Sequence, residues 1–151
     1  MNKLILFNEN THPESWRIND PSCTLSTSKK KELIFFDKEH SKKLWHNCIS
    51  KKYTHLLLLN ESQIKIRHSE TLDFTNPKKG ELFFKNHLKN ATLVIFFWGP
   101  LCSCLAPAKT VSKHWNDFFL PSDENSITYI PNTNKIIFSF EERFFAGTIK
   151  K

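Results

Sequence analysis

The sequence predicts one α+β domain, in which a mostly antiparallel sheet is packed by about three helices. Three observations lead to this prediction. The chain of 151 residues has the usual size of a single domain, and its 14 Phe and 4 Trp supply a bulky core. Short apolar runs that suit strands outnumber the segments with helical periodicity. No internal repeat or low-complexity linker divides the chain, so residues 1–151 are expected to form a single domain.

The first elements are expected after a polar N-terminal stretch. Residues 19–31 are rich in Ser, Thr and Lys and resemble a loop. The apolar run 33–36 indicates a buried strand, and a helix is predicted over 37–50. Its apolar positions recur at helical spacing and define one buried face, formed by Leu44, Trp45, Cys48 and Ile49.

The middle of the chain is expected to hold a hairpin and a second helix. Segments 56–59 and 63–68 read as two strands, the second with Ile64 and Ile66 on a buried face. A turn is predicted over 76–80, because it contains Pro77 and Gly80. A helix over 81–90 follows, whose inward residues are expected to be Leu82, Phe83 and Leu88.

The C-terminal part is predicted with the clearest patterns. The run 92–98 (TLVIFFW) is the most apolar stretch and suits a central strand covered on both faces. A helix is expected over 106–120, with Ala108, Val111, Trp115, Phe118 and Phe119 buried. Strands 127–130 and 135–140 flank a turn sequence and predict a hairpin, and 144–149 suits a last strand.

The charge is basic, with 22 Lys and Arg against 15 Asp and Glu and a net charge of +7. Only three of the basic residues are Arg, whereas sequence-specific nucleic-acid sites rely on the two-pronged hydrogen bonding of Arg. The aromatic residues lie in apolar runs, where they cannot serve as stacking platforms between lysines. A solvated Lys-rich surface is favoured over a nucleic-acid site, which stays the alternative interpretation.

Cysteine usage and hydropathy predict a cytoplasmic protein with reduced thiols. Four cysteines are too few for a disulfide scaffold in a chain of this length. No apolar run is long enough for a signal peptide or a membrane span, so no membrane partner is expected. Cys102 and Cys104 are one residue apart and have only His114 nearby, which is not the ligand spacing of a structural zinc site.

No catalytic pattern emerges from the remaining polar residues. The seven histidines fall in no metal-ligand motif, and three glycines give little material for a nucleophile elbow or a phosphate loop. The carboxylate pairs 123–124 and 141–142 are adjacent in sequence, so their side chains point to different sides. The sequence therefore predicts a protein that is not an enzyme and uses no cofactor and no metal.

Aromatic and charged residues, most of them in the C-terminal part, recur in an order typical of one protein class. They are Trp16, 41–45 (SKKLW), 96–98 (FFW), 111–115 (VSKHW), 116–119 (NDFF), 121–125 (PSDEN) and 144–147 (FFAG). This pattern resembles immunity proteins of bacterial contact-dependent growth inhibition and related polymorphic toxin systems. The resemblance covers mainly residues 92–147.

The resemblance implies a toxin-neutralising binding protein that forms a tight heterodimer with a cognate toxin domain, commonly a nuclease. Such a protein needs no active site. Two contact surfaces stay open. One is the Lys-rich N-terminal part, facing an acidic toxin surface. The other is an acidic patch that would bind a basic toxin, formed by Asp117, Asp123, Glu124, Glu141 and Glu142.

Overall fold

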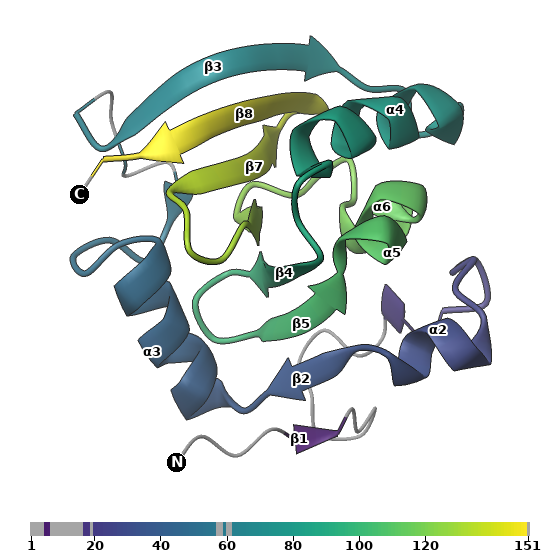
Figure 1. Cartoon of the computed structure of the whole chain (residues 1–151), viewed down its shortest axis with the longest axis horizontal. Helices are drawn as coiled ribbons and strands as arrows, with labels where there is room; N and C mark the ends of the chain where they lie inside the picture. Colours follow the sequence, from purple (N-terminus) through teal and green to yellow (C-terminus); the bar gives the residue numbers. More distant parts are fainter. Residues whose placement is uncertain (1–4, 7–16, 19, 57–58, 60–61, 151) are drawn as a thin grey trace.

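One antiparallel sheet organises the computed structural model, which describes residues 5–6, 17–18, 20–56, 59 and 62–150. Its eight strands run in the order β1-β2-β5-β4-β6-β7-β8-β3 (Figure 1). All neighbouring strands are antiparallel. The strands are β1 (Ile5–Leu6), β2 (Ile34–Phe36), β3 (Ile64–Thr71), β4 (Leu93–Trp98), β5 (Ser103–Pro107), β6 (Ser126–Tyr129), β7 (Lys135–Phe140) and β8 (Arg143–Ile149).

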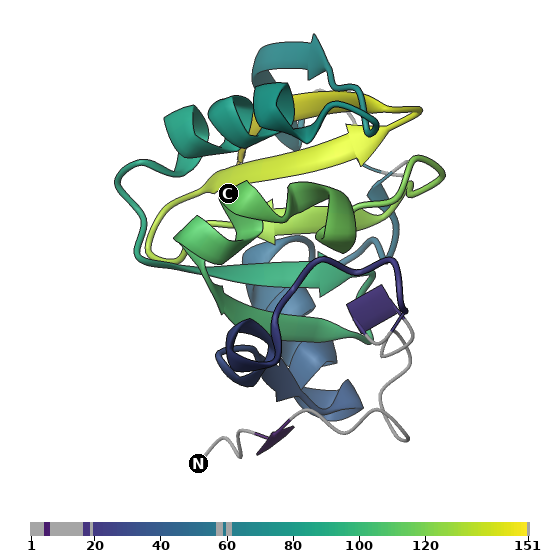
Figure 2. The same cartoon turned by 90° about the vertical axis from the view of Figure 1, so that its right-hand side faces the viewer.

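The helices divide between the two faces of this sheet. They are α2 (Thr27–Lys31), α3 (Lys38–Cys48), α4 (Pro77–Leu88), α5 (Ala108–Lys113) and α6 (Trp115–Phe118). Figure 2 shows α4, α5 and α6 in front of the sheet and α3 behind it. The predicted α+β fold with a mostly antiparallel sheet is confirmed. Within the described part of the chain no helix has the length and apolar character needed to cross a membrane.

Strand β4 separates two hydrophobic clusters, because successive side chains of a strand point to opposite faces. Val94, Phe96 and Trp98 belong to the cluster under α4, α5 and α6. Ile95 and Phe97 belong to the cluster on the α3 side. The strand is paired on both edges, with β5 and β6. The predicted central strand, covered on both faces, is therefore confirmed.

Helix α3 confirms the prediction of a helix with one apolar face. It begins after Asp37, whose carboxylate accepts a hydrogen bond from the backbone N–H of His40 at 2.7 Å and caps the helix. Trp45 is buried and meets Phe97 edge to face, with ring centroids 5.6 Å apart. Capping at one end and burial of this face explain the bounds and position of α3.

The prediction of one continuous helix over 106–120 is wrong. Pro107 ends β5, a strand that the sequence interpretation missed, and Ala108 begins α5. The helix is interrupted at His114, whose dihedral angles (φ −112°, ψ 29°) are not helical, and α6 follows. The predicted buried face is confirmed, since five residues have at most 3% exposure: Ala108, Val111, Trp115, Phe118 and Phe119.

Helix α4 begins earlier than expected. The turn predicted over 76–80 is wrong, because Pro77 occupies the first helical position, where its missing N–H has no partner to lose. Leu82 is exposed, not inward-facing, while the neighbouring Phe84 is fully buried. Phe83 and Leu88 are buried as predicted.

Two further expectations need correction. The segment 19–31 contains the short helix α2, which Ser26 caps through its side chain. Strand β3 pairs with β8, whereas the partner expected for it was the segment 56–59. Part of that segment, together with 60–61, lies outside the described residues, and Leu56 belongs to a 3₁₀ turn. Ile66, expected on a buried face, is 46% exposed and lines an open hollow beside Phe138 and Phe145.

Candidate functional site

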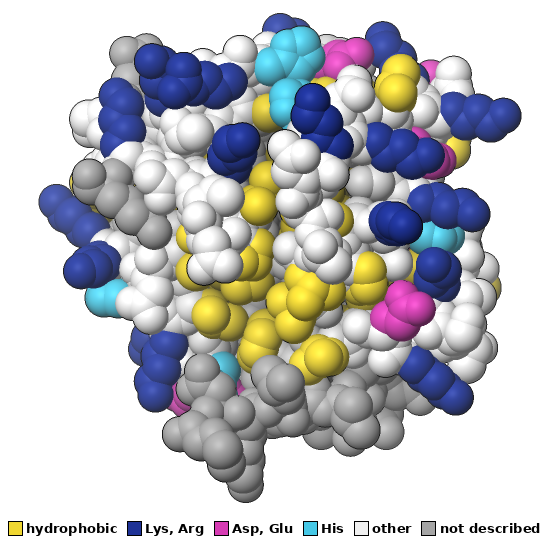
Figure 3. Space-filling view, in the orientation of Figure 1, with side chains coloured by type: hydrophobic (Ala, Val, Ile, Leu, Met, Phe, Trp, Pro, Cys, Tyr) yellow, Lys and Arg dark blue, Asp and Glu magenta, His cyan; other side chains and the backbone are white. Residues whose placement is uncertain are grey.

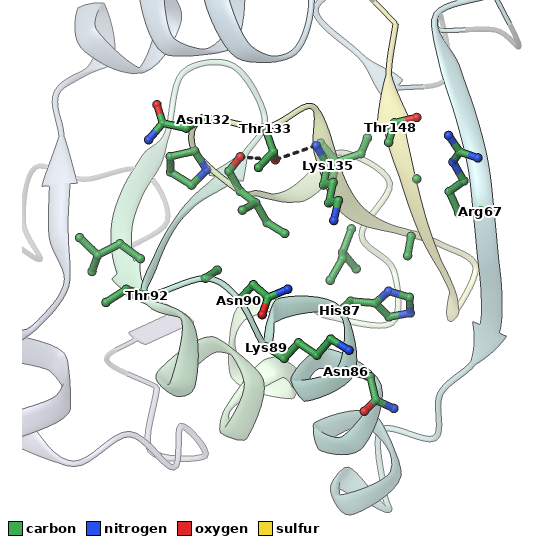
Figure 4. A pocket seen from close by; sticks show the side chains of 18 of the residues that line it. Arg67, Asn86, His87, Lys89, Asn90, Thr92, Asn132, Thr133, Lys135 and Thr148 are labelled. Carbon is green, nitrogen blue, oxygen red and sulfur yellow. Dashed lines mark hydrogen bonds between the residues drawn. The ribbon is translucent and has the colours of Figure 1, made fainter.

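A groove opens where the C-terminal end of α4 faces the ends of several strands (Figure 4). Its volume is about 790 Å³, within the range of ligand-binding clefts. The floor is aliphatic and is formed by Leu93, Leu105, Ile130, Ile136, Ile137 and Ala146. In Figure 3 hydrophobic side chains are exposed at the centre of this face, with Lys and Arg side chains above them and to both sides and with acidic side chains among these on the right.

The charges around this groove have one sign. Arg67 on β3, Lys89 after α4 and Lys135 on β7 line it, and no described Asp or Glu does. None of these three cations has a carboxylate within 4.0 Å among the described residues. Because unpaired cations facing a partly apolar hollow produce a positive local potential, the groove is suited to an anionic partner.

Hydrogen bonds hold the turn that carries Lys135. The Thr133 hydroxyl donates to the carbonyl oxygen of Ile130 at 2.7 Å and accepts from the backbone N–H of Lys135 at 3.0 Å (Figure 4). The Tyr129 hydroxyl donates to the carbonyl oxygen of Thr133 at 2.7 Å. Asn132 adopts a left-handed conformation (φ 65°), which asparagine tolerates better than most residues. The turn therefore places Lys135 at a fixed point on the rim.

His87 forms part of the groove wall on α4. Its ring lies 4.6 Å from that of Phe83 and 5.5 Å from that of His68, centroid to centroid. Partial burial lowers the pKa of His87, and the neighbouring His68 lowers it further. A lowered pKa favours the neutral imidazole at pH 7. The constant positive charge of the groove therefore comes from its Lys and Arg side chains.

A second hollow of about 570 Å³ adjoins the groove, and Lys89 and Ala91 line both. It also carries a basic rim, formed by Lys29, Lys85, Lys109 and Lys113. Glu81 is the only acidic residue among its described lining residues, and it pairs with Lys85 at 2.7 Å. The positive surface thus continues past the end of α4 toward α5.

Two of the acidic residues expected to bind a partner have internal hydrogen-bond partners. Asp123 forms an ion pair with Arg17 and also accepts from the backbone N–H of Leu120 and the hydroxyl of Ser126. Its side chain is 7% exposed. Asp117 accepts from the backbone N–H and the hydroxyl of Thr24, and its side chain is 8% exposed. Both carboxylates connect segments of the fold.

The other three acidic residues are exposed and lie away from the groove. Glu141 and Glu142 form the tip of the β7–β8 hairpin. Glu124 lines a separate hollow of about 200 Å³ together with Phe138 and Phe145. Phe138 packs against the cluster on the α3 side of the sheet. The structure thus divides the five predicted residues between internal and exposed roles. Partner binding by the exposed three stays a prediction.

The cysteines singled out by their spacing are buried. Cys102 and Cys104 have 2% and 0% exposure, and burial raises the pKa of Cys104 well above its ordinary value. His114 lies with its Nδ1 atom 2.8 Å from the hydroxyl of Thr24. Among the described residues no three His, Cys, Asp or Glu side chains are grouped to hold a metal ion.

Comparison with known proteins gave no relative: no protein-family model, curated protein or solved structure matches this chain.

Proposed function

We propose that this protein is a binding protein that neutralises a bacterial toxin by forming a stable heterodimer with it, and that the groove beside α4 is its contact surface. We choose this surface because it combines an aliphatic floor with a charged rim that is wholly cationic among the described residues. Apolar area at the centre and polar groups at the rim is the usual anatomy of a protein interface.

The proposed partner presents an acidic surface. Arg67, Lys89 and Lys135 are exposed and have no described carboxylate partner, so a partner's carboxylates do not have to displace existing ion pairs. Complementary charges of this kind speed association and discriminate against wrong partners. Leu93, 44% exposed on the floor, offers apolar area that only a bound partner would bury.

Of the two surfaces that the sequence left open, the basic one has the better support, although Lys109, Lys113 and Lys135 extend it beyond the Lys-rich N-terminal part. Asp117 and Asp123 already bond within the fold, which leaves three exposed acidic residues for an acidic contact surface. The groove and its adjoining hollow together hold seven Lys and Arg and one paired acid among their described lining residues.

Nucleic-acid binding is the second candidate function, and this same excess of lysine favours it. A protein that binds phosphates through lysines loses affinity steeply as salt rises, because bound counterions are released on association. Retention on a DNA column that is insensitive to salt, or no retention at low salt, would exclude this candidate.

The test of the proposed function is protection of growth. The chain is co-expressed with the toxin domain encoded beside its gene, and wild type is expected to restore growth. The double variant Lys89→Glu/Lys135→Glu is expected to lose protection. Lys42→Glu/Lys43→Glu, which changes two exposed residues on α3, behind the sheet, is the matched control and is expected to protect. The absence of a neighbouring toxin gene together with a lack of protection would refute the proposal.

A further inference from the structure

We propose that the partner inserts an extended polypeptide segment, in which acidic residues alternate with aliphatic ones, along the groove and into the adjoining hollow. This inference rests on the groove being the contact surface, as proposed above, and it adds the chemistry of the segment that fills it.

The adjacency of the two hollows supports an extended occupant. Lys89 and Ala91, just after α4, line both hollows, so an extended segment that crosses these residues contacts both. Helix α4 lines both hollows, together with β3, β4, β5, β7 and β8 in the groove and with α2 and α5 in the second hollow. A compact ligand would fill one hollow and leave the other empty.

Charge along this path supports an acidic occupant. Beyond Lys89, the second hollow presents Lys29, Lys109 and Lys113, none of which has a carboxylate within 4.0 Å in the described part of the chain. Glu81 does not reverse this sign, because Lys85 pairs with it at 2.7 Å. Unpaired cations therefore occur along both hollows, as binding of several separated carboxylates requires.

The apolar lining separates a polypeptide from a nucleic-acid strand. The second hollow has small and aliphatic walls at Leu88, Ala91 and Ala108, and the groove has an aliphatic floor. No Phe, Tyr or Trp is among the described lining residues of either hollow, which leaves His87 and Arg67 as the described lining groups that could stack on a base. Aliphatic side chains of a bound segment suit such walls, because burial of apolar area stabilises the complex.

Side-chain amides are available for the backbone of that segment. Asn86, Asn90 and Asn132 line the groove, are exposed and have no side-chain hydrogen bond to another described residue. Each amide can donate to a carbonyl and accept from an N–H group of an extended strand. Together with the lysines they complete a set of groups that matches a peptide with acidic side chains.

Binding of defined probes tests this inference without the toxin. Fluorescence anisotropy of a labelled peptide, in which single leucines alternate with pairs of glutamates, is titrated with the full chain. The same peptide with lysine for glutamate and an oligothymidylate of equal charge are the comparison probes. The acidic peptide is expected to bind with the highest affinity. Lys89→Glu is expected to weaken its binding by about tenfold or more, because residue 89 lines both hollows.

Lys109→Glu separates an extended from a compact occupant, since Lys109 lines only the second hollow. It is expected to weaken binding as well, while Lys42→Glu on α3 leaves it within about twofold. Circular dichroism checks that each variant is folded.

Tighter binding of the oligothymidylate, or no binding of the acidic peptide, would overturn the inference. Failure of growth protection with intact peptide binding would instead reject the toxin-neutralising function alone.

Discussion

Arg17 and Asp123 form a two-contact ion pair, with Nη1 to Oδ2 at 2.7 Å and Nη2 to Oδ1 at 2.8 Å. The two side chains are only 10% and 7% exposed. Arg17 also donates to the carbonyl oxygen of Phe118, at the end of α6. The pair therefore connects the N-terminal part of the chain to the loop that precedes β6, more than 100 residues later.

Removing one member of this pair leaves a largely buried charge without its partner. Asp123→Ala is expected to lower the free energy of unfolding by about 3 kcal/mol, because Arg17 then loses its carboxylate while its side chain stays largely buried. Urea denaturation measures the change. Glu124→Ala, at the exposed neighbouring position, is the control and is expected to change stability by less than about 0.5 kcal/mol. Equal stability of the two variants would show that the pair has no structural role.

Gly80→Ala is expected to destabilise the protein even though alanine favours helices. A Cβ atom at position 80 would clash with the indole ring of Trp115, which is fully buried and whose N–H donates to the carbonyl oxygen of Pro77. Overpacking of this kind costs about 1–3 kcal/mol, more than the gain of about 1 kcal/mol in helix propensity. Thermal unfolding measures the sign. Lys78→Ala on the exposed side of α4 serves as the control, and a raised midpoint for Gly80→Ala would contradict the packing argument.

Substitutions at the tip of the β7–β8 hairpin are expected to stabilise the protein. Glu141 and Glu142 both have positive φ angles (50° and 64°), which cost energy for residues with a side chain and which Asn-Gly adopts readily. Glu141→Asn/Glu142→Gly is expected to raise the free energy of unfolding by about 1 kcal/mol. Glu141→Gln/Glu142→Gln removes the same charges without relieving the backbone, so equal effects of the two double variants would attribute the gain to charge.

The pKa of His87 predicts a loss of stability in mild acid. Below the ordinary histidine pKa of about 6.5 the unfolded chain binds a proton at residue 87, while the folded protein, whose His87 pKa is lowered, binds it only at lower pH. The free energy of unfolding therefore falls as pH drops from about 7 through the lowered pKa. His87→Gln is expected to reduce this dependence and His46→Gln, at an exposed position on α3, to leave it unchanged. An unaltered slope in His87→Gln would reject the prediction.

The sequence predicts most of the sheet because its strands carry strong local signals. The run that forms β4 is apolar at every position, and the turn before Lys135 has the composition of a hairpin loop. Strand β5 lacks such a signal, because it begins with a polar residue, Ser103. Ser103 is nevertheless fully buried, and its hydroxyl forms a hydrogen bond of 2.7 Å with the hydroxyl of Ser41. A buried polar pair between distant segments cannot be read from either segment alone.

The candidate site was harder to predict for a related reason. Arg67, Lys89 and Lys135 come from separate elements, and the sheet order, in which β8 lies between β3 and β7, brings Arg67 and Lys135 to one groove. As charged residues, Asp117 and Asp123 are expected at the surface, yet both form long-range hydrogen bonds, to Thr24 and Arg17, and their side chains are largely buried. The net positive charge is compatible with an anionic partner, but it does not indicate which part of the surface binds that partner.

The dissociation constant of the complex with the toxin domain, measured by isothermal titration calorimetry, tests the role of the groove most directly. Reversal of the groove charges in Lys89→Glu/Lys135→Glu is expected to weaken the complex by about 100-fold or more, while reversal of the hairpin charges in Glu141→Lys/Glu142→Lys changes it by less than about threefold. Full affinity in the groove variant, with loss of binding in the hairpin variant, would contradict the account and place the contact at the acidic surface.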